Sequence, residues 1–428
     1  MTASIEVRGG STELMEDMRD AVHRRVEAAG EMHGCDTEIT RTGESIRQDC
    51  DEELVDPVSE VVTDRSDSLS LIRRDALAAS GVLARALSDR DRPFQVSVAD
   101  LPADTERTTD ADLTVAVGRR DPLADCSLAG LAEPASETAF AVARELDADP
   151  DAALALAGCV ADGRAATGAV TEAAEATGLE RRPGVAVPTT DLVDGLAHST
   201  LVHAPFSGDS GAAAAALAAA GFETGGDDAD EPRVDAPDLD EGERRRAASL
   251  VALRTVGDDS VPPRGGHAVE RALRPSVGGP FETVGGYADV LDAVARERPG
   301  TGVALALGHD VGEAALDAWR AHARRAHAAV ADATTGRYDG LFVARAETAG
   351  APVATLARLV HDYRSPEPVT LAVTEGAAAV VADDREIGPV LTTAAEGVDG
   401  TAAATGTTGR ARFDAETGAV ITAVREAL

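Results

Sequence analysis

The sequence predicts an α/β protein with a largely parallel sheet in one domain and a second, smaller α/β domain at the C-terminus. Three observations lead to this class. Short apolar runs alternate with segments of helical periodicity along most of the chain. An acidic stretch at 225–243 divides this alternation in two. The chain has 428 residues, 44% of them hydrophobic, which is enough for two or three domains with real cores.

The first unit, residues 1–60, is predicted to form a strand, a helix, a strand and a helix. Ile5 and Val7 alternate with polar neighbours, as in a half-buried strand. Apolar residues then recur every fourth position from Leu14 to Val26, and Gly30 follows the expected helix end. Residues 35–40 are a plausible return strand. This unit is small for an independent domain.

Residues 61–224 are predicted to hold the parallel-sheet domain. Leu77, Val82, Leu83 and Leu87 fit one face of a helix. Strands are expected at 94–98 and 113–117, and helices at about 136–147 and 150–163. Strands that alternate with helices favour parallel pairing.

The stretch 225–243 holds nine acids, one arginine and two prolines, which is typical of a linker or an exposed loop. Residues 244–428 then form the predicted C-terminal domain. Its expected helices lie around 244–255, 283–297, 312–332 and 352–363. They alternate with apolar runs at 302–307, 340–345 and 369–373.

The charge is extreme and has one sign. There are 75 acidic and 40 basic residues, all of the latter arginine, so the net charge is −35 at pH 7. Acid spread along the whole chain with lysine excluded indicates adaptation to molar salt, where the Debye length is about 3 Å and self-repulsion is screened. We therefore interpret the charge as a response to the solvent and not to a partner.

Several classes of protein are not expected. No apolar run approaches the roughly 18–20 residues of a membrane span. The N-terminus lacks the basic and apolar pattern of a signal peptide. The four cysteines are far apart, without a CxxC pair, so neither a disulfide framework nor a zinc knuckle is expected. A cytoplasmic, soluble protein is the expectation.

Two short motifs suggest chemistry, but a structural role is favoured for each. Residues 206–211 contain the GDSG string of serine nucleophiles, yet they lead into an alanine-rich helix that Ser207, Asp209 or Ser210 could cap. His198 and His203 could bind a metal. Their spacing would place them on opposite faces of a strand, and no third ligand is nearby.

Glycine-rich strings at 278–286 and 397–409 could hold phosphates through backbone N–H groups. A P-loop is excluded because no lysine follows the glycines anywhere in the chain. For 278–286 a turn that leads into a helix is favoured. Five arginine clusters could contact phosphates, but solvated counter-charges are the simpler interpretation. They lie at 73–74, 119–120, 181–182, 244–246 and 324–325.

From about residue 66 to the C-terminus the chain resembles the DHH phosphoesterase superfamily, in particular the RecJ-like proteins of halophilic archaea. Residues 73–83 (RRDALAASGVL) resemble the first motif of the family, a His-x-Asp-x-Asp-Gly turn that leads into a helix. Residues 155–162 (ALAGCVAD) resemble the fourth motif, and 400–406 (GTAAATG) the C-terminal Gly-His-x-x-Ala-Ala-Gly loop. The segment 280–309 also looks like the halophile group.

The resemblance implies a two-metal centre, and most of its ligands are missing here. In the first motif Leu71 and Arg73 stand where the family has His and Asp, Ala76 replaces the glycine, and only Asp75 is retained. Gly118 occupies the position of the second motif's aspartate, and no Asp-His-His string exists. The metal ligands that remain as candidates are Asp75 and Asp162, with Asp112, Asp121 or Asp125 as substitutes. Two clustered cations need a dense set of carboxylates, so the chain resembles a degenerate member, and Mn²⁺ or Mg²⁺ is expected only if it is active.

The resemblance further implies a cleft between the two domains that carries single-stranded DNA or RNA. The glycines of the 400–406 loop would allow close backbone approach, and arginines on the next strand would neutralise phosphates. The residues predicted to bind nucleic acid are Gly400, Thr401, Gly406, Arg410 and Arg412. Archaeal RecJ-like proteins associate with the GINS complex, and the RecJ-related subunit of the eukaryotic replicative helicase binds partners without cutting. A protein partner of this kind is therefore an alternative.

The leading hypothesis is a RecJ-like protein of replication or repair whose exonuclease activity is lost. The alternative is an active metal-dependent 5′→3′ single-strand exonuclease with unorthodox ligands. Residues 1–60 weakly resemble the edge of the dimerisation domain of a zinc-dependent amidase or carbamoylase, without that family's metal ligands. A third hypothesis, an amidase, therefore lacks a metal centre.

Overall fold

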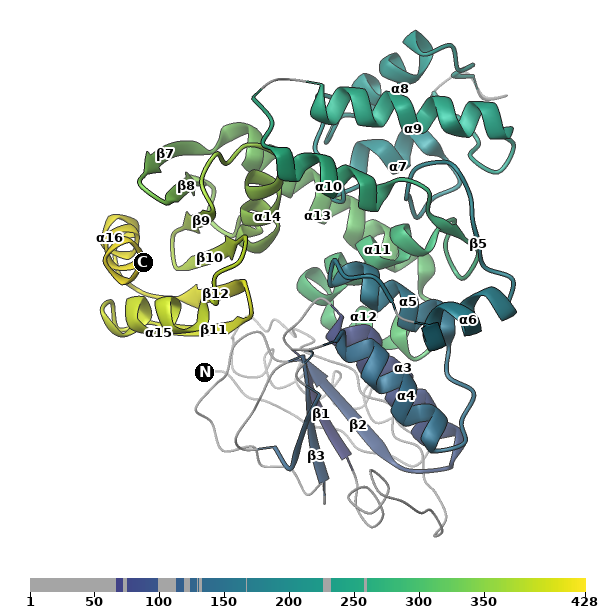
Figure 1. The fold of residues 1–428 in the computed structure, drawn as a ribbon, viewed down its shortest axis with the longest axis horizontal. Coiled ribbons are helices and arrows are strands. Elements are labelled where there is room, and N and C mark those ends of the chain that lie inside the picture. The colour runs from purple at the N-terminus through teal and green to yellow at the C-terminus, as the bar shows by residue number, and fades with distance from the viewer. Residues whose placement is uncertain are drawn as a thin grey trace, which may run out of the picture.

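A computed structural model describes residues 67–71, 75–98, 113–118, 124–128, 130, 133–166, 168–225, 232–257 and 260–428. The elements predicted for residues 1–60 lie outside these residues. The described part contains two larger sheets with helices between and around them (Figure 1). It is an α/β protein with a parallel-sheet part and a C-terminal part that holds a six-stranded sheet, which confirms the predicted fold class.

The first sheet has four parallel strands in the order β2-β1-β3-β4. These are β1 Asp67–Leu71, β2 Phe94–Val98, β3 Leu113–Val117 and β4 Cys126–Leu128. The predicted strands at 94–98 and 113–117 are thus confirmed with their bounds. Because the strands are parallel, their carboxyl ends meet at one edge of the sheet, which is where sites of open α/β sheets form.

Helices α3 to α6 follow or pack near this sheet: α3 Ala76–Asp89, α4 Ala135–Glu145, α5 Ala152–Ala161 and α6 Gly168–Ala176. The predicted helices at 136–147 and 150–163 are α4 and α5. Their core is rich in alanine, as the low aromatic content requires. Phe140, Leu77 and Leu154 are its largest wholly buried members from these helices.

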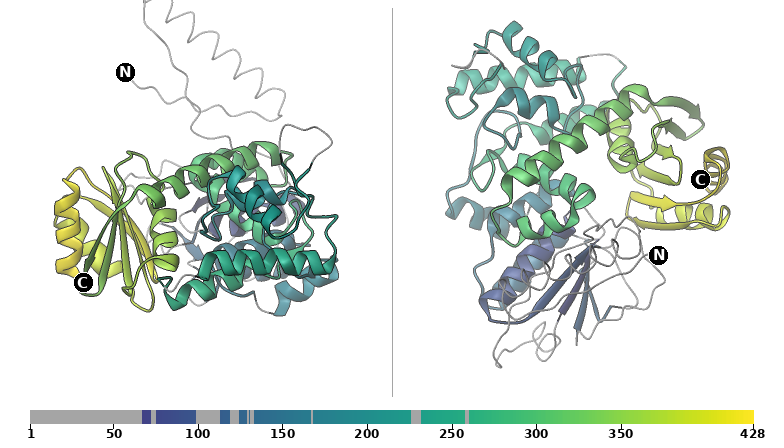
Figure 2. Two further views of the ribbon diagram at one scale, coloured as in Figure 1. Left: turned by 90° about the horizontal axis from the view of Figure 1, so that it is seen from above. Right: turned by 180° about the vertical axis from the view of Figure 1, so that it is seen from behind.

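A helical region connects the two sheets. It comprises α7 Leu192–His198, α8 Ser210–Ala219, α9 Glu241–Val256, α10 Pro263–Ala272, α11 Val284–Glu297, α12 Pro299–Ala306 and α13 Gly312–Asp332. A two-stranded pair, β5 Glu180–Arg181 with β6 Ser276–Val277, lies in the same region. The long α13 crosses this region on the side that faces the viewer in the right-hand view of Figure 2.

The apolar run 302–307 is not a strand: residues 302–306 lie in α12, with Leu307 as its C-cap. Pro299 begins this helix, a position where proline's missing N–H costs nothing. Its apolar side chains pack on α3 so closely that a Cβ at Gly81 would lie 2.6 Å from the Ala306 carbonyl oxygen. A short apolar run cannot by itself be distinguished as helix or strand, and here the contact with α3 decides.

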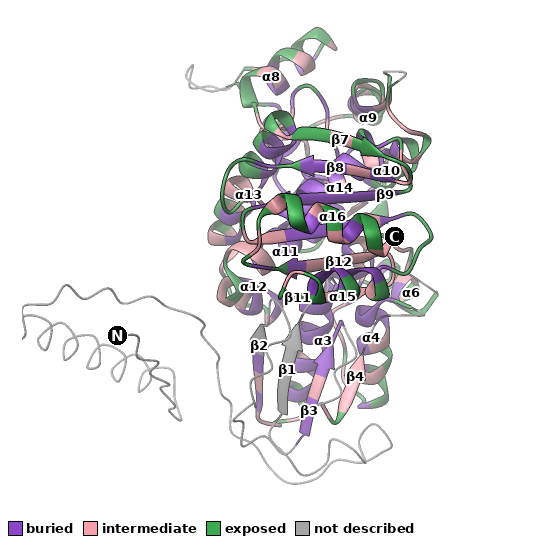
Figure 3. Cartoon of the chain, turned by 90° about the vertical axis from the view of Figure 1, so that its left-hand side faces the viewer, coloured by how far each residue is buried: buried purple, intermediate pink, exposed green. Residues whose placement is uncertain are grey.

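The second sheet has six strands in the order β11-β12-β10-β9-β8-β7. They are β7 Thr334–Tyr338, β8 Leu341–Arg345, β9 Val369–Thr374, β10 Ala377–Ala382, β11 Thr401–Thr405 and β12 Thr408–Arg412. The β8–β9 pair is parallel and the others are antiparallel. One face packs on α14 Val353–Tyr363. The other carries α15 Gly388–Glu396 and α16 Thr417–Ala427, which lie in front of the sheet in Figure 3.

The predicted division of the chain at 225–243 stays a prediction, and the cores show how residues on its two sides pack. Residues 281–319 share one apolar core with α3, α4 and α5. A second core joins 185–222 with parts of 234–272 and 326–379. Part of the acidic stretch is anchored, since Val234 is buried and its N–H donates to Asp191. In the part of the chain that the structure describes, no helix is long and apolar enough to cross a membrane.

Candidate functional site

Asp75 lies four residues beyond the end of β1, at the carboxyl edge of the parallel sheet, directly before α3. Its side chain is fully buried and does not cap its own helix. Instead Oδ2 accepts a hydrogen bond of 2.5 Å from the N–H of Ala135, the first residue of α4. Pro134, the N-cap of α4, has no side-chain acceptor, so Asp75 supplies the missing cap and meets the positive end of the helix dipole.

Asp162 is the C-cap of α5 and is committed to an arginine. Its Oδ2 forms an ion pair with Nε of Arg164, and the same guanidinium donates to the Gly130 carbonyl oxygen at 2.6 Å. The Asp162 side chain is 12% exposed. The guanidinium group of Arg164 is therefore already paired with one carboxylate oxygen of Asp162.

Asp75 and Asp162 lie close enough to act on the same thiol, Cys159. Burial raises the pKa of Cys159 to about 12. A hydrogen bond with Ser136 lowers this pKa in part, and the negative charges of Glu137, Asp75 and Asp162 raise it by smaller amounts. Glu137 is buried in the first turn of α4. The sequence analysis did not identify Glu137 as a neighbour of Cys159. The signal that could have found it is an acidic residue in the first turn of a predicted helix, just after a proline.

The residues in the described part do not fit a divalent metal centre. No three His, Cys, Asp or Glu residues there are arranged to hold a metal ion. Asp125 does not join the other two: its Oδ2 accepts from the N–H and hydroxyl of Thr114 at 2.9 and 2.8 Å, near the start of β3 and so at the opposite end of the sheet. Asp112, Asp121, Arg73 and Arg119 lie outside the described residues.

The segment predicted as a nucleic-acid-binding loop is mostly a strand. Thr401 begins β11, and Gly406 turns the hairpin into β12 with φ +57°. Gly400 is required for packing, since a Cβ there would lie 2.6 Å from the Arg412 carbonyl oxygen. The expectation of a glycine loop at 400–406 is thus wrong in its local structure, because residues 401–405 pair antiparallel with 408–412.

Arg410 and Arg412 lie on one face of β12, two residues apart. Arg410 is opposite Ala403 and Ala379, and Arg412 is opposite Thr401 and Ala377. This is the face on which α14 packs further along the sheet, because Ala379 belongs to that core. Their cross-strand neighbours are small, Arg410 is half-buried and Arg412 is exposed, and we call this surface the β12 face.

The histidines that suggested a metal pair have separate structural roles. His198 is the last residue of α7, and its Nδ1 lies 2.8 Å from Asp194 Oδ1. Its ring packs edge to face against the ring of Trp319. His203 stacks on His327 instead. The expectation of opposite strand faces is wrong, since α7 precedes the loop that holds His203, but the favoured structural role is confirmed.

The other motifs are also structural. Asp209 caps α8 through a 2.9 Å bond from the Ala212 N–H, as predicted for the GDSG string. Gly278 and Gly279 have φ of +114° and +96°, and Thr283 then caps α11, so 278–286 is the predicted turn before a helix.

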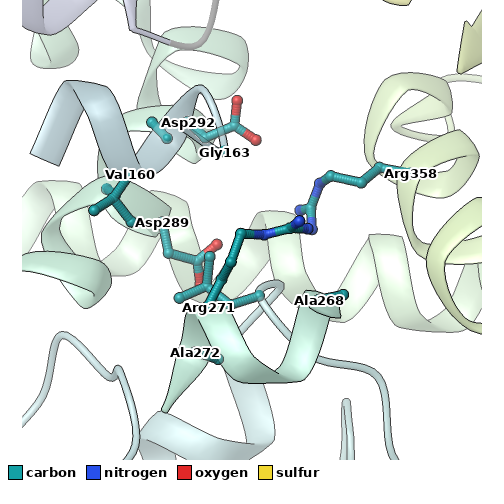
Figure 4. A pocket seen from close by; sticks show the side chains of 11 residues that line it. Val160, Gly163, Ala268, Arg271, Ala272, Asp289, Asp292 and Arg358 are labelled. Carbon is teal, nitrogen blue, oxygen red and sulfur yellow. The ribbon is translucent and has the colours of Figure 1, made fainter. Parts of the chain in front are cut away.

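A cavity of about 50 Å³ lies where α5, α10 and α11 meet α14 (Figure 4). Beneath it Asp289 is wholly buried and accepts from three donors: the Thr200 N–H at 2.9 Å, the Thr200 hydroxyl at 2.5 Å and Trp319 Nε1 at 2.8 Å. Arg358 holds the same loop by donating to the carbonyl and hydroxyl oxygens of Thr200. Sequence reasoning missed this network, since its residues are scattered over the chain.

Comparison with solved structures shows which fold the chain shares. The chain superposes on CDC45 from Entamoeba histolytica with a TM-score of 0.52 and 8% identity, over 85% of this chain and 95% of that one. RecJ of Thermus thermophilus in complex with Mg²⁺ gives a TM-score of 0.43 and 14% identity over 86% of this chain. This chain spans about half of that protein, 50% of its length. The chain therefore shares the overall fold of CDC45.

Sequence comparison identifies the family. The chain is 57% identical over 357 residues to the uncharacterized protein rrnAC1427 of Haloarcula marismortui, covering 83% of this chain and 90% of that protein. The family model described as the C-terminal domain of rrnAC1427 matches residues 333–426, which begin at the end of α13 and include the six-stranded sheet. The chain belongs to the family of rrnAC1427.

Proposed function

We propose that this protein is a RecJ-like and CDC45-like protein of DNA replication or repair that binds single-stranded nucleic acid and has lost phosphodiesterase activity. The observation that carries the loss of activity is the use of both retained family carboxylates in the protein itself. Asp75 caps α4, and Asp162 pairs with Arg164. The fold shared with CDC45 supports the replication class.

The β12 face supports the binding role. The backbone positions of Arg410 and Arg412 are about 6–7 Å apart along the strand, the spacing of alternate residues, which is similar to the distance between successive phosphates of an extended single strand. Alanine and threonine neighbours allow a strand to lie close to the sheet. A replisome protein with an acidic surface, such as a GINS-like partner, would use the same two charges. A cytoplasmic location remains part of this proposal.

Binding is tested by anisotropy of a labelled single-stranded DNA across a series of KCl concentrations at which the protein stays folded. We expect Arg410→Gln combined with Arg412→Gln to weaken binding and to lower the slope of log K against log salt by about 1.4, at about 0.7 per lost phosphate contact on a single strand. Arg425→Gln is the matched control, because Arg425 is exposed on α16, across the sheet. Equal effects of the two variants would contradict a role for the β12 face.

Activity is tested on end-labelled single-stranded DNA in molar KCl with Mn²⁺ or Mg²⁺. We expect no degradation by the wild type. The variant Asp75→Asn keeps an oxygen to accept from Ala135 and so is expected to fold, as circular dichroism would check. Degradation by the wild type that Asp75→Asn abolishes would establish the alternative, an active exonuclease.

A further inference from the structure

The cavity between α5, α10, α11 and α14 has an apolar wall and a charged mouth. Val160, Ala161, Leu201, Ala268 and Ala288 contribute to the wall. Arg271 from α10 and Arg358 from α14 both line it and point toward one another in Figure 4. Two like charges that converge at one place repel each other unless an anion lies between them.

Neither arginine is saturated by the protein. Arg358 uses its terminal nitrogens for Thr200, but its Nε is buried and has no hydrogen-bond partner. Arg271 makes one ion pair, at 3.6 Å to Asp362, and its side chain is 50% exposed. Five donors per guanidinium leave several N–H groups available for a ligand.

The two acids that line the cavity are directed to other partners. Asp289 accepts from Thr200 and Trp319, and burial raises its pKa against the lowering by these hydrogen bonds. Asp292 pairs with Arg296 on its own helix at 2.6 Å. Among the described residues the two arginines make one ion pair, the long one from Arg271 to Asp362, so their positive charge is balanced only in part.

We propose that this cavity binds one tetrahedral oxyanion of the phosphate class between Arg271 and Arg358. Planar guanidinium groups bind phosphate oxygens with two parallel hydrogen bonds each. A volume of about 50 Å³ suits one small oxyanion and not a nucleoside. The anion is either a free phosphate ion or a phosphate at the end of a nucleic-acid strand, entering past the exposed Arg271.

The chain carries its own reporter for this site. Its single tryptophan, Trp319, donates to Asp289 directly beneath the cavity. We expect inorganic phosphate, exchanged for chloride at constant ionic strength, to change the tryptophan fluorescence saturably and to raise the unfolding temperature. Nitrate, which is planar and singly charged, is expected to change neither.

The variant Arg271→Gln is expected to weaken the response to phosphate by at least about tenfold, because one of two charge-assisted contacts is lost. Its side chain is half exposed with one weak ion pair, so the fold is expected to survive. Arg254→Gln, at an exposed position of α9, is the control and should respond as the wild type does. No response of the wild type, or an equal response of Arg271→Gln, would overturn the proposal.

A second arm identifies the source of the anion. Oligonucleotides with a terminal phosphate or a terminal hydroxyl are added in place of phosphate. A fluorescence response to the phosphorylated strand alone supports a strand end as the ligand; a response to free phosphate without one to either strand supports the free ion. The experiment with free phosphate requires no binding of nucleic acid. Its failure can therefore be distinguished from a failure of the proposed function.

Discussion

A chain of hydrogen bonds through His203 and His327 determines the tautomers of both rings. Nε2 of His327 lies 3.0 Å from the Ser199 carbonyl oxygen, which can only accept, so this nitrogen carries a hydrogen. Nδ1 of His327 therefore accepts from Nδ1 of His203 at 3.1 Å. Nε2 of His203 then accepts from Arg364. Both rings are neutral in this arrangement.

The histidine pair predicts loss of stability in acid. Burial lowers the pKa of His203 to about 4, and burial with the charge of His203 lowers the pKa of His327 to about 3. In the unfolded chain both would titrate near 6.5. Below that pH the unfolded state binds protons that the folded state does not. The free energy of unfolding should fall from about pH 6.5 to pH 4, by up to about 1.4 kcal/mol per pH unit for each ring.

Denaturant unfolding at pH 7, 6, 5 and 4 measures this slope. His203→Gln should have a smaller slope than the wild type over this range, whatever its stability at pH 7, because one titrating ring is gone. His267→Gln is the control, since His267 is exposed on α10. A slope unchanged by His203→Gln would contradict the neutral pair.

At the scale of elements, α11 is held against the segment before α7 at backbone distance. A Cβ at Gly286 would lie 2.1 Å from the Val187 carbonyl carbon and 2.2 Å from the Pro188 nitrogen. The hydroxyl of Thr283 donates to the Val187 oxygen at 2.7 Å and accepts from the Gly286 N–H. This contact fixes the start of the helix that carries Asp289 and Asp292.

Gly286→Ala should lower the free energy of unfolding by about 3 kcal/mol or more, because the new methyl group meets backbone that cannot move aside. Gly266→Ala is a matched control, since Gly266 is also helical and nothing lies within 4 Å of the position that its new methyl group would take. There alanine should raise stability by up to about 1 kcal/mol through helix propensity. Urea denaturation of the two variants beside the wild type checks both, and similar stabilities would contradict the close contact.

At the scale of the whole molecule, the net charge of −35 on 428 residues predicts a protein that needs salt. Lowering KCl from about 1 M to 0.1 M lengthens the Debye distance from about 3 to about 10 Å, so repulsion between surface acids rises. We expect the unfolding temperature to fall steadily across this range in calorimetry. An unfolding temperature independent of KCl would contradict the interpretation of the charge as a salt adaptation.

The sequence by itself determined the features that depend on neighbours along the chain. The α/β alternation, strands 94–98 and 113–117, the Asp209 cap and the turn at 278–286 agree with the structure. Each rests on side-chain period, capping or turn chemistry within a few residues.

Only the tertiary structure decided where distant residues meet. It made 299–306 a helix through contact with α3, and it made 401–405 a strand by pairing with 408–412. It brought Glu137 beside Asp75 and Cys159, and it turned Arg271 and Arg358 toward one cavity. Most of these contacts join residues that are far apart along the chain. Their geometry follows from the packing of whole elements, which local propensity does not encode.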